Sequence, residues 1–133
     1  MARLLNLEGD RPLDLARAVE SGLPYRAFDR LRESLDWQQS EAARLIQIKD
    51  RTLNRRKDAG RFKPEESDHL VRASRIVALA TQLFEGDKRQ AKHWLESPQQ
   101  ALDGRKPVDL ACTDVGAREV ERLIQRLEHG VFT

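Results

Sequence analysis

The chain has 133 residues, with 39% hydrophobic and 35% charged side chains and a formal net charge of only +2. This length and composition suit one soluble globular domain, and no apolar run approaches the about 20 residues that cross a bilayer. The single cysteine excludes an internal disulfide and a cysteine-based metal cluster, and it fits the reducing cytoplasm.

Helical periodicity runs through the chain, and no segment shows the two-residue period that is typical of a strand. The first half predicts helices over residues 12–21, 24–34, 40–46 and 50–59. Gly22 and Pro24 separate the first two helices, and a short connection over 47–49 joins the third helix to the fourth. Gly60 ends the fourth helix at a position that tolerates left-handed backbone angles.

A long amphipathic helix is predicted to begin at Pro64 and to end near Gly86. A helix over 89–97 and a loop over 98–107 follow, and Thr113 is expected to cap a last helix that ends at Gly130. The apolar stripe of the long helix comprises Leu70, Ala73, Ile76, Val77, Ala80, Leu83 and Phe84. The apolar face of the last helix is predicted to comprise Val115, Val120, Leu123, Ile124 and Leu127.

These elements predict an all-α protein in three parts. Residues 1–63 would form the N-terminal helices and a helix-turn-helix, and residues 64–87 a long connecting helix. Residues 88–133 would form a small C-terminal helical domain. The stripe on the connecting helix could supply a dimer seam, or it could pack inside one chain.

Two short helices joined by a tight turn, with a basic second helix, are typical of a helix-turn-helix. Ala43 is small where the second helix would cross the first, and Leu53 is expected to point inward and fix the crossing. The remaining core around the motif is expected to come from Phe28, Trp37, Leu45, Ile46 and Ile48.

The outward face of the second helix carries the side chains that we expect to contact DNA. Arginine can bind guanine, and asparagine can bind adenine, through paired hydrogen bonds in the major groove. The predicted base contacts are Arg51, Asn54 and Arg55, and phosphate contacts are expected from Arg56, Lys57, Arg61 and Lys63. Thr52 could make either kind of contact. Residues 24–63 carry 11 Lys and Arg against 6 Asp and Glu, which suits a polyanion partner but also a solvated helix surface.

Two positions depart from the usual motif. Gln47 stands where the turn usually carries glycine, and Lys49 precedes the second helix where serine or threonine is usual. Asp50 could cap that helix instead of Lys49. The alternative interpretation is a buried helical hairpin with a charged outer face.

No set of residues predicts catalysis, a metal site or a cofactor. The three histidines are too widely spaced for a metal site, and Cys112 lacks the basic neighbours of a nucleophile. Asp109 and Asp114 are expected to cap helices, and no catalytic triad or phosphate-binding glycine loop is present. We therefore expect a binding protein and not an enzyme.

The C-terminal part contains AKHWLESP at 91–98, ALDGRKPVDL at 101–110 and TDVGAREV at 113–120, with Gly130 and Val131 near the end. This ordered set resembles the toxin-binding domain of the Xre/MbcA/ParS antitoxins. The segments TLNRR at 52–56 and PEESD at 64–68 are similar to the Xre-type helix-turn-helix of the same family.

The resemblance implies an antitoxin of a bacterial type II toxin–antitoxin pair. The usual partner in this family is a RES-domain toxin that consumes NAD, and the antitoxin blocks it while repressing their shared operon. The resemblance also implies a homodimer, within a larger complex, on symmetric operator DNA. The rival hypothesis is a stand-alone transcriptional regulator whose C-terminal domain only mediates assembly.

The C-terminal tail is our hypothesis for the toxin contact, because an apolar side chain next to a terminal carboxylate could fill a concave site. Together with the last helix, the tail would cover the entrance to the toxin's active site. The assigned residues are Leu127, Gly130, Val131, Phe132 and Thr133. The alternative is a frayed terminus, and Trp94, Leu95 and Leu102 are expected to lie in the core.

Overall fold

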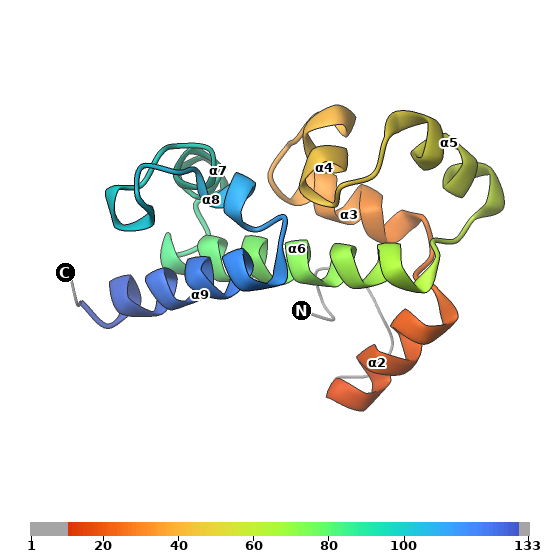
Figure 1. Ribbon diagram of the computed structural model, residues 1–133, viewed down its shortest axis with the longest axis horizontal. Helices are drawn as coiled ribbons and strands as arrows, with labels where there is room; N and C mark the ends of the chain where they lie inside the picture. The colour runs from red at the N-terminus through yellow and green to blue at the C-terminus, as the bar shows by residue number, and fades with distance from the viewer. Residues whose placement is uncertain (1–10, 131–133) are drawn as a thin grey trace. The chain divides into compact units, whose positions relative to one another are not determined.

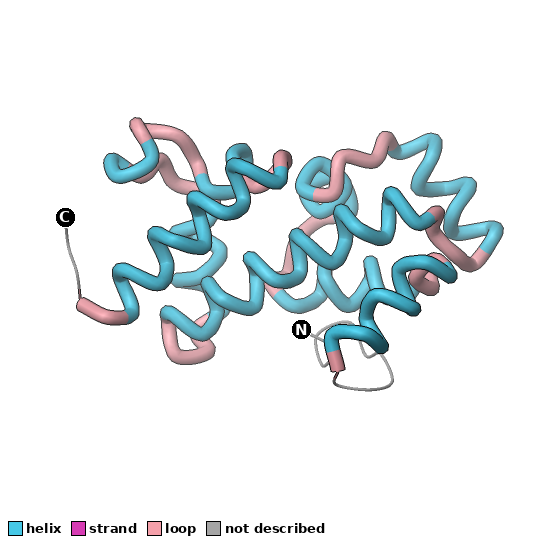
Figure 2. The backbone as a smooth tube through the Cα atoms, turned by 60° about the horizontal axis from the view of Figure 1, so that its bottom comes forward, coloured by secondary structure: helices cyan, strands magenta, loops and turns pink. Residues whose placement is uncertain are grey.

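The structure is a computed structural model that describes residues 11–130, and within that range every regular element is a helix (Figures 1 and 2). In chain order the helices are α2 (Pro12–Ser21), α3 (Arg26–Ser34), α4 (Gln39–Leu45), α5 (Asp50–Ala59), α6 (Pro64–Leu83), α7 (Lys88–Leu95), the 3-10 turn η1 (Gln100–Leu102), α8 (Pro107–Leu110) and α9 (Asp114–Glu128). The all-α prediction is therefore confirmed. None of the helices between residues 11 and 130 is long and apolar enough to cross a membrane.

The chain divides into two compact units, residues 1–74 and residues 75–133, called unit 1 and unit 2 below. The boundary falls inside α6, so the first part of this helix belongs to unit 1 and the last part to unit 2. From the sequence, all of residues 64–87 were predicted to connect two domains. In the structure, contacts within the chain assign the start of α6 to unit 1 and its end to unit 2. The stripe residues Leu70, Ala73, Ile76, Val77 and Ala80 are buried in the single chain, and none is more than 2% exposed.

In unit 1, the segment that precedes α3 pairs with the segment that follows α5. The backbone N–H of Tyr25 donates to the Gly60 carbonyl at 3.0 Å, and that of Phe62 donates to the Leu23 carbonyl at 2.9 Å. The rings of Tyr25, Phe28 and Phe62 form a cluster with centroid separations of 5.6–6.4 Å. This pairing holds the exit of α5 against the start of α3, as part of the core of unit 1.

Gly22 allows the two segments to approach each other closely. Its φ is +87°, and a Cβ atom built at this position would lie 2.2 Å from the carbonyl oxygen of Phe62. The buried hydroxyl of Ser67, in α6, accepts a hydrogen bond of 2.8 Å from the Leu23 N–H. A buried polar group of α6 therefore meets a backbone donor that would otherwise be unsatisfied.

In unit 2, α9 packs closely on the segment that precedes it. A Cβ atom added to Gly116 would lie 2.0 Å from the Leu110 carbonyl oxygen, so the residue must be glycine for α8 and α9 to be this close. The Thr113 hydroxyl accepts a 3.0 Å hydrogen bond from the Gly116 N–H, which confirms the predicted N-cap of α9. The core of unit 2 includes Ile76, Val77, Ala80, Ala91, Leu95, Leu102, Ala111, Ala117, Val120, Leu123 and Ile124.

Three expectations for unit 2 were wrong. Residues 98–107 are not a plain loop, because they contain the η1 turn and an isolated bridge between Gln99 and Arg105, and α8 follows directly. Neither expected aspartate is a cap. Thr113 caps α9 and Asp114 instead pairs with Arg118 one turn later, whereas Asp109 lies inside α8, whose N-cap is Lys106. Val115 is 74% exposed, since the face of α9 that meets the core runs through Gly116 and Ala117.

Candidate nucleic-acid interface

At the start of α4, a carboxylate accepts a hydrogen bond from the backbone that precedes the helix. The Glu41 side chain accepts a 2.9 Å hydrogen bond from the backbone N–H of Gln38, the N-cap residue. This contact satisfies a donor at the helix start and fixes where α4 begins. The face of α4 that carries Ala42, Ala43 and Leu45 is buried.

The turn after α4 closes through two backbone hydrogen bonds. The Ile48 N–H donates to the Ala43 carbonyl at 3.0 Å, and the Gln47 N–H donates to the Arg44 carbonyl at 3.1 Å. This pair of bonds defines a Schellman motif, in which the residue after the C-cap takes left-handed angles. Gln47 occupies that position with a φ of +57°. The turn therefore has the geometry that glycine usually provides, although its residue is glutamine.

Helix α5 begins at Asp50, and Lys49 is its N-cap without a side-chain capping bond. The expectation that Asp50 would be the cap was therefore wrong, because the helix already includes this residue. Its carboxylate lies in the first turn, where negative charge interacts favourably with the helix dipole. At the other end Gly60 has φ +82° and ψ 0°, as predicted for the residue that ends α5.

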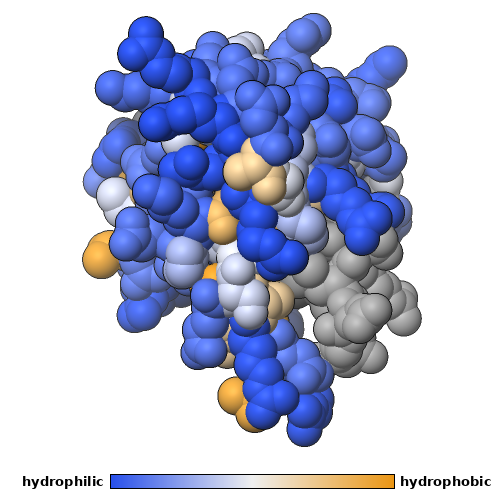
Figure 3. All heavy atoms as spheres, turned by 90° about the vertical axis from the view of Figure 1, so that its right-hand side faces the viewer, coloured by the Kyte–Doolittle hydropathy of each residue, from blue (hydrophilic) through white to orange (hydrophobic). Residues whose placement is uncertain are grey.

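The outward face of α5 is set by one inward residue. Leu53 is fully buried, whereas Arg51, Asn54, Arg55 and Lys57 are exposed. Ala43, at 3% exposure, provides the small side chain that the crossing of the two helices needs. Figure 3 shows that the end of unit 1 facing the viewer is covered mainly by hydrophilic side chains. The sequence interpretation and the geometry therefore agree that Arg51, Asn54, Arg55 and Lys57 face away from the core, whereas Thr52 and Arg56 are half-buried.

Four of the side chains assigned to DNA also bind within unit 1. The Arg55 guanidinium donates to the Thr52 hydroxyl at 3.4 Å, which holds two of the assigned DNA contacts side by side. Arg61 is exposed but donates to the Gly22 carbonyl at 2.7 Å. Arg56 is half-buried and binds Glu66 of α6.

The Arg56–Glu66 pair is a bidentate ion pair. The Nε atom of Arg56 lies 2.6 Å from Oε1 of Glu66, and Nη2 lies 3.1 Å from Oε2. Burial alone would raise the pKa of the Glu66 carboxyl, but hydrogen bonds from Arg56 and from the Lys63 N–H outweigh it and hold the pKa below its usual value. The pKa of Arg56 is raised, mainly by its hydrogen bond to Glu66. The pair is thus charged on both sides at neutral pH.

Behind the motif, Phe28 is fully buried and Trp37 is 4% exposed, as expected for residues that brace it. The Nδ1 atom of His69, in α6, lies 3.2 Å from the Ile46 carbonyl oxygen in the turn. The turn between α4 and α5 is therefore held both by its own backbone bonds and by a side chain from α6.

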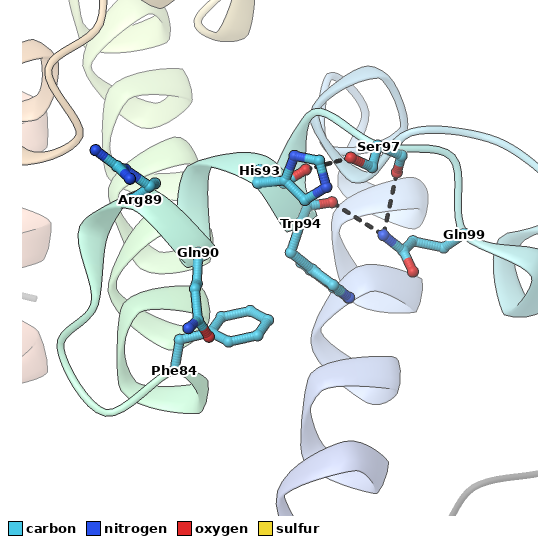
Figure 4. A pocket seen from close by; sticks show the side chains of 7 residues that line it. All are labelled: Phe84, Arg89, Gln90, His93, Trp94, Ser97 and Gln99. Carbon is cyan, nitrogen blue, oxygen red and sulfur yellow. Dashed lines mark hydrogen bonds between the residues drawn. The ribbon is translucent and has the colours of Figure 1, made fainter.

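Unit 2 contains an open, largely apolar pocket of about 520 Å³ beside α7 (Figure 4). Phe84 and Trp94 supply its rings, with centroids 6.4 Å apart, and Gln90, His93 and Gln99 are among its polar lining residues. The Gln99 amide donates to the Trp94 carbonyl at 3.0 Å, which fixes one wall. Trp94 is therefore half-buried at a surface pocket, and not in the core as expected, whereas Leu95 and Leu102 do lie in the core.

Comparison with known proteins matches each of the two units to a protein family. Residues 14–75 match the family model of the antitoxin Xre-like helix-turn-helix domain, and residues 79–130 match that of the antitoxin Xre/MbcA/ParS C-terminal toxin-binding domain. A protein named antitoxin Xre from Yersinia enterocolitica is 37% identical over 98% of this chain and 89% of its own length. The chain belongs to the Xre antitoxin family.

Two further relatives have similar coverage. An antitoxin Xre from Photorhabdus laumondii is 32% identical over 86% of the chain and 78% of its own length. A probable mycobacterial cidal antitoxin from Mycobacterium tuberculosis is 33% identical over 79% of the chain and 80% of its own length. The antitoxin described here thus combines a helix-turn-helix domain with a toxin-binding domain.

The assigned toxin-contact residues lie at the end of this antitoxin. Leu127 is half-buried on α9, and Gly130 has a φ of +72° just after the helix. Val131, Phe132 and Thr133 lie outside the described residues. Their role stays a prediction.

Sequence reasoning missed two features of this antitoxin. It placed Phe84 on an apolar stripe and Trp94 in the core, and did not foresee a pocket between them. It also treated Arg56 as a phosphate contact, whereas Glu66 binds its guanidinium. A glutamate at the third position of a helix, as Glu66 is in α6, is typical of a capping side chain, but nothing local indicates that it also binds a residue of α5.

Proposed function

We propose that this antitoxin binds operator DNA next to its own gene through α5 and neutralises a RES-domain toxin through unit 2. The observation that supports DNA binding best is the face of α5 opposite the buried Leu53, where Arg51, Asn54 and Arg55 are exposed together. These side chain types form the paired hydrogen bonds that distinguish guanine and adenine in the major groove. Because unit 1 matches an Xre-like helix-turn-helix domain, this face is the one that would enter the groove.

The contacts divide into base reading and backbone binding. Arg51, Asn54 and Arg55 would read bases, Thr52 would contact a base or a phosphate, and Lys57 would bind phosphate. Arg61 would be a further phosphate contact whose guanidinium also holds the fold, whereas the Arg56 guanidinium is already bound by Glu66. Two copies of the chain would place two α5 helices on a symmetric site, because one short helix reads few base pairs.

The DNA part can be tested with a fragment from upstream of the chain's own coding sequence. The antitoxin should bind that fragment at lower concentration than a shuffled fragment of equal length and composition, with an affinity that falls as salt rises. Equal affinity for both fragments would contradict operator recognition. The stoichiometry of the complex, measured by light scattering, should give two antitoxin chains per symmetric site.

For the toxin, we propose that the tail of Val131, Phe132 and Thr133, together with Leu127 and Gly130, covers the entrance to an NAD-consuming active site. The match of residues 79–130 to a toxin-binding domain supports unit 2 as the contact surface, and α9 leads directly into the tail. The antitoxin would act by binding, without a reaction of its own. Operator DNA and NAD would both be met in the cytoplasm.

The toxin part is tested by co-expression with the product of the neighbouring gene and by an NAD assay. The full chain should form a stable complex and stop NAD loss, and a chain lacking residues 130–133 should bind more weakly and leave NAD loss partly uninhibited. Full inhibition by the shortened chain would remove the tail from the proposal. A neighbouring product without NAD-consuming activity would contradict the RES partner.

A further inference from the structure

The carboxylate of Glu66 joins three parts of unit 1. Its Oε1 atom accepts the Lys63 N–H at 2.9 Å, just before α6, and the Nε–H of Arg56 at 2.6 Å. Its Oε2 atom accepts Nη2–H of Arg56 at 3.1 Å. The side chains of Arg56 and Glu66 are only 14% and 16% exposed, so solvent screens the pair less than a surface ion pair.

Arg56 lies three residues after Leu53, and residues at this spacing share one face of a helix. Leu53 fixes α5 to the core, and the Arg56–Glu66 pair fixes the same face to the start of α6. Two attachments on one face restrict how far the helix can turn about its own axis. The exposed side chains Arg51 and Asn54 then keep a fixed direction.

We propose that Glu66 is a positioning residue for DNA reading, which holds α5 in the rotation that its base contacts need. Glu66 accepts hydrogen bonds from the Nε–H and Nη2–H groups of Arg56, and it thereby keeps the Arg56 guanidinium away from DNA phosphates. This inference rests on the operator binding proposed above. Glu66 touches no base, and acts only through Arg56.

The decisive variant is Glu66→Gln, because glutamine still offers an oxygen to the Lys63 N–H and can keep the cap of α6. It removes the charge that holds the guanidinium. With the upstream fragment and its shuffled counterpart as probes, the ratio of the two affinities should fall at least about fivefold, the equivalent of one weakened base contact. The slope of log affinity against log salt should steepen by about 0.9 for each released Arg56 that binds a phosphate.

Glu65→Gln is the matched control, since it makes the same charge change one residue earlier, at an exposed side chain. It should keep the wild-type affinity ratio and salt slope. Arg56→Met breaks the ion pair without releasing a cation that could bind phosphate. It should therefore lower the affinity ratio, but the slope of log affinity against log salt should not become steeper. A loss of folded protein would weaken binding to both fragments equally, and would leave the ratio unchanged.

Two results would overturn the proposal: a wild-type affinity ratio and slope in Glu66→Gln, or equal effects of Glu66→Gln and Glu65→Gln. A measurement without DNA separates this inference from the proposed function. Amide hydrogen exchange in α5 should be faster in Glu66→Gln than in Glu65→Gln, because the helix has lost one attachment. Unchanged exchange overturns the positioning role, whereas equal wild-type binding to both fragments contradicts only the operator proposal.

Discussion

The two carboxylate oxygens of Glu66, in α6, accept hydrogen bonds from Nε–H and Nη2–H of Arg56, in α5, at 2.6 and 3.1 Å. Arg56 is ten residues earlier in the chain, so the pair is a tertiary contact and not a helical one. It gives unit 1 a stabilising interaction that depends on one ionised carboxyl.

This dependence predicts a response to pH. The pKa of Glu66 is lowered in the folded chain, so the pair contributes stability above the pKa of an unfolded glutamate, 4.5, and loses it as pH falls through the lower folded value. In urea denaturation, the stability difference between wild type and Glu66→Gln should therefore be largest near pH 7 and shrink below about pH 4.5. A difference that is constant down to pH 3 would contradict the ionic origin of the contribution, and Glu65→Gln should follow the wild type.

Gly116→Ala should destabilise unit 2. At an ordinary helix position this change gains about 1 kcal/mol, because alanine is the better helix former. Here the new Cβ would lie 2.0 Å from the Leu110 carbonyl oxygen, so α8 and α9 must separate, at a cost of about 1–3 kcal/mol. Chemical denaturation measures the sign directly, and Val115→Ala, at a 74% exposed site on the same helix, should stay within about 0.5 kcal/mol of wild type.

Gln47→Gly should stabilise the turn between α4 and α5. Gln47 has a φ of +57°, where a side chain costs roughly 1 kcal/mol and glycine does not. After the greater chain entropy of glycine is subtracted, we expect a small gain, of at most about 1 kcal/mol, in the free energy of unfolding. Gln39→Gly, at the start of α4, should give no gain, and an equal change at both sites would show that the backbone angle of Gln47 is not the cause.

The exposed cations of α5 should affect DNA binding in different ways. Arg51→Ala or Arg55→Ala should weaken binding to the upstream fragment and relax preference at one base, by about 1–3 kcal/mol. Lys57→Ala should weaken binding to the upstream and shuffled fragments alike, and reduce the salt slope by about 0.9. Affinities of single-base variants of the fragment separate the two patterns. Identical behaviour of all three variants would contradict the assigned groove face.

Local signals were enough to predict most of the helices. Residues 12–21 and 50–59 were predicted with the bounds that the structure shows for α2 and α5, because proline, glycine and the apolar spacing all act within a few residues. Helix α8 was missed, since four residues are too few to show a helical period. Val115 was misplaced because a pattern of apolar residues does not say which of them a neighbouring helix covers.

The candidate site was predictable where it depends on one helix, and not where it depends on two. The inward position of Leu53 fixes which side chains of α5 face away from the core, and the sequence alone shows that spacing. The ion pair between Arg56 and Glu66, and the pocket beside Trp94, depend on how separate helices pack. Such contacts follow from tertiary structure, which no window of sequence contains.

The chain has two tryptophans, and they fall in different units: Trp37 is almost fully buried beneath the helix-turn-helix, and Trp94 lines the pocket of unit 2. Each unit therefore contains its own fluorophore, and the two differ in their access to water. Trp37→Phe would leave emission from unit 2 alone, and Trp94→Phe emission from unit 1 alone. Unfolding of each half, or quenching when a partner arrives, can then be followed separately without attaching a dye.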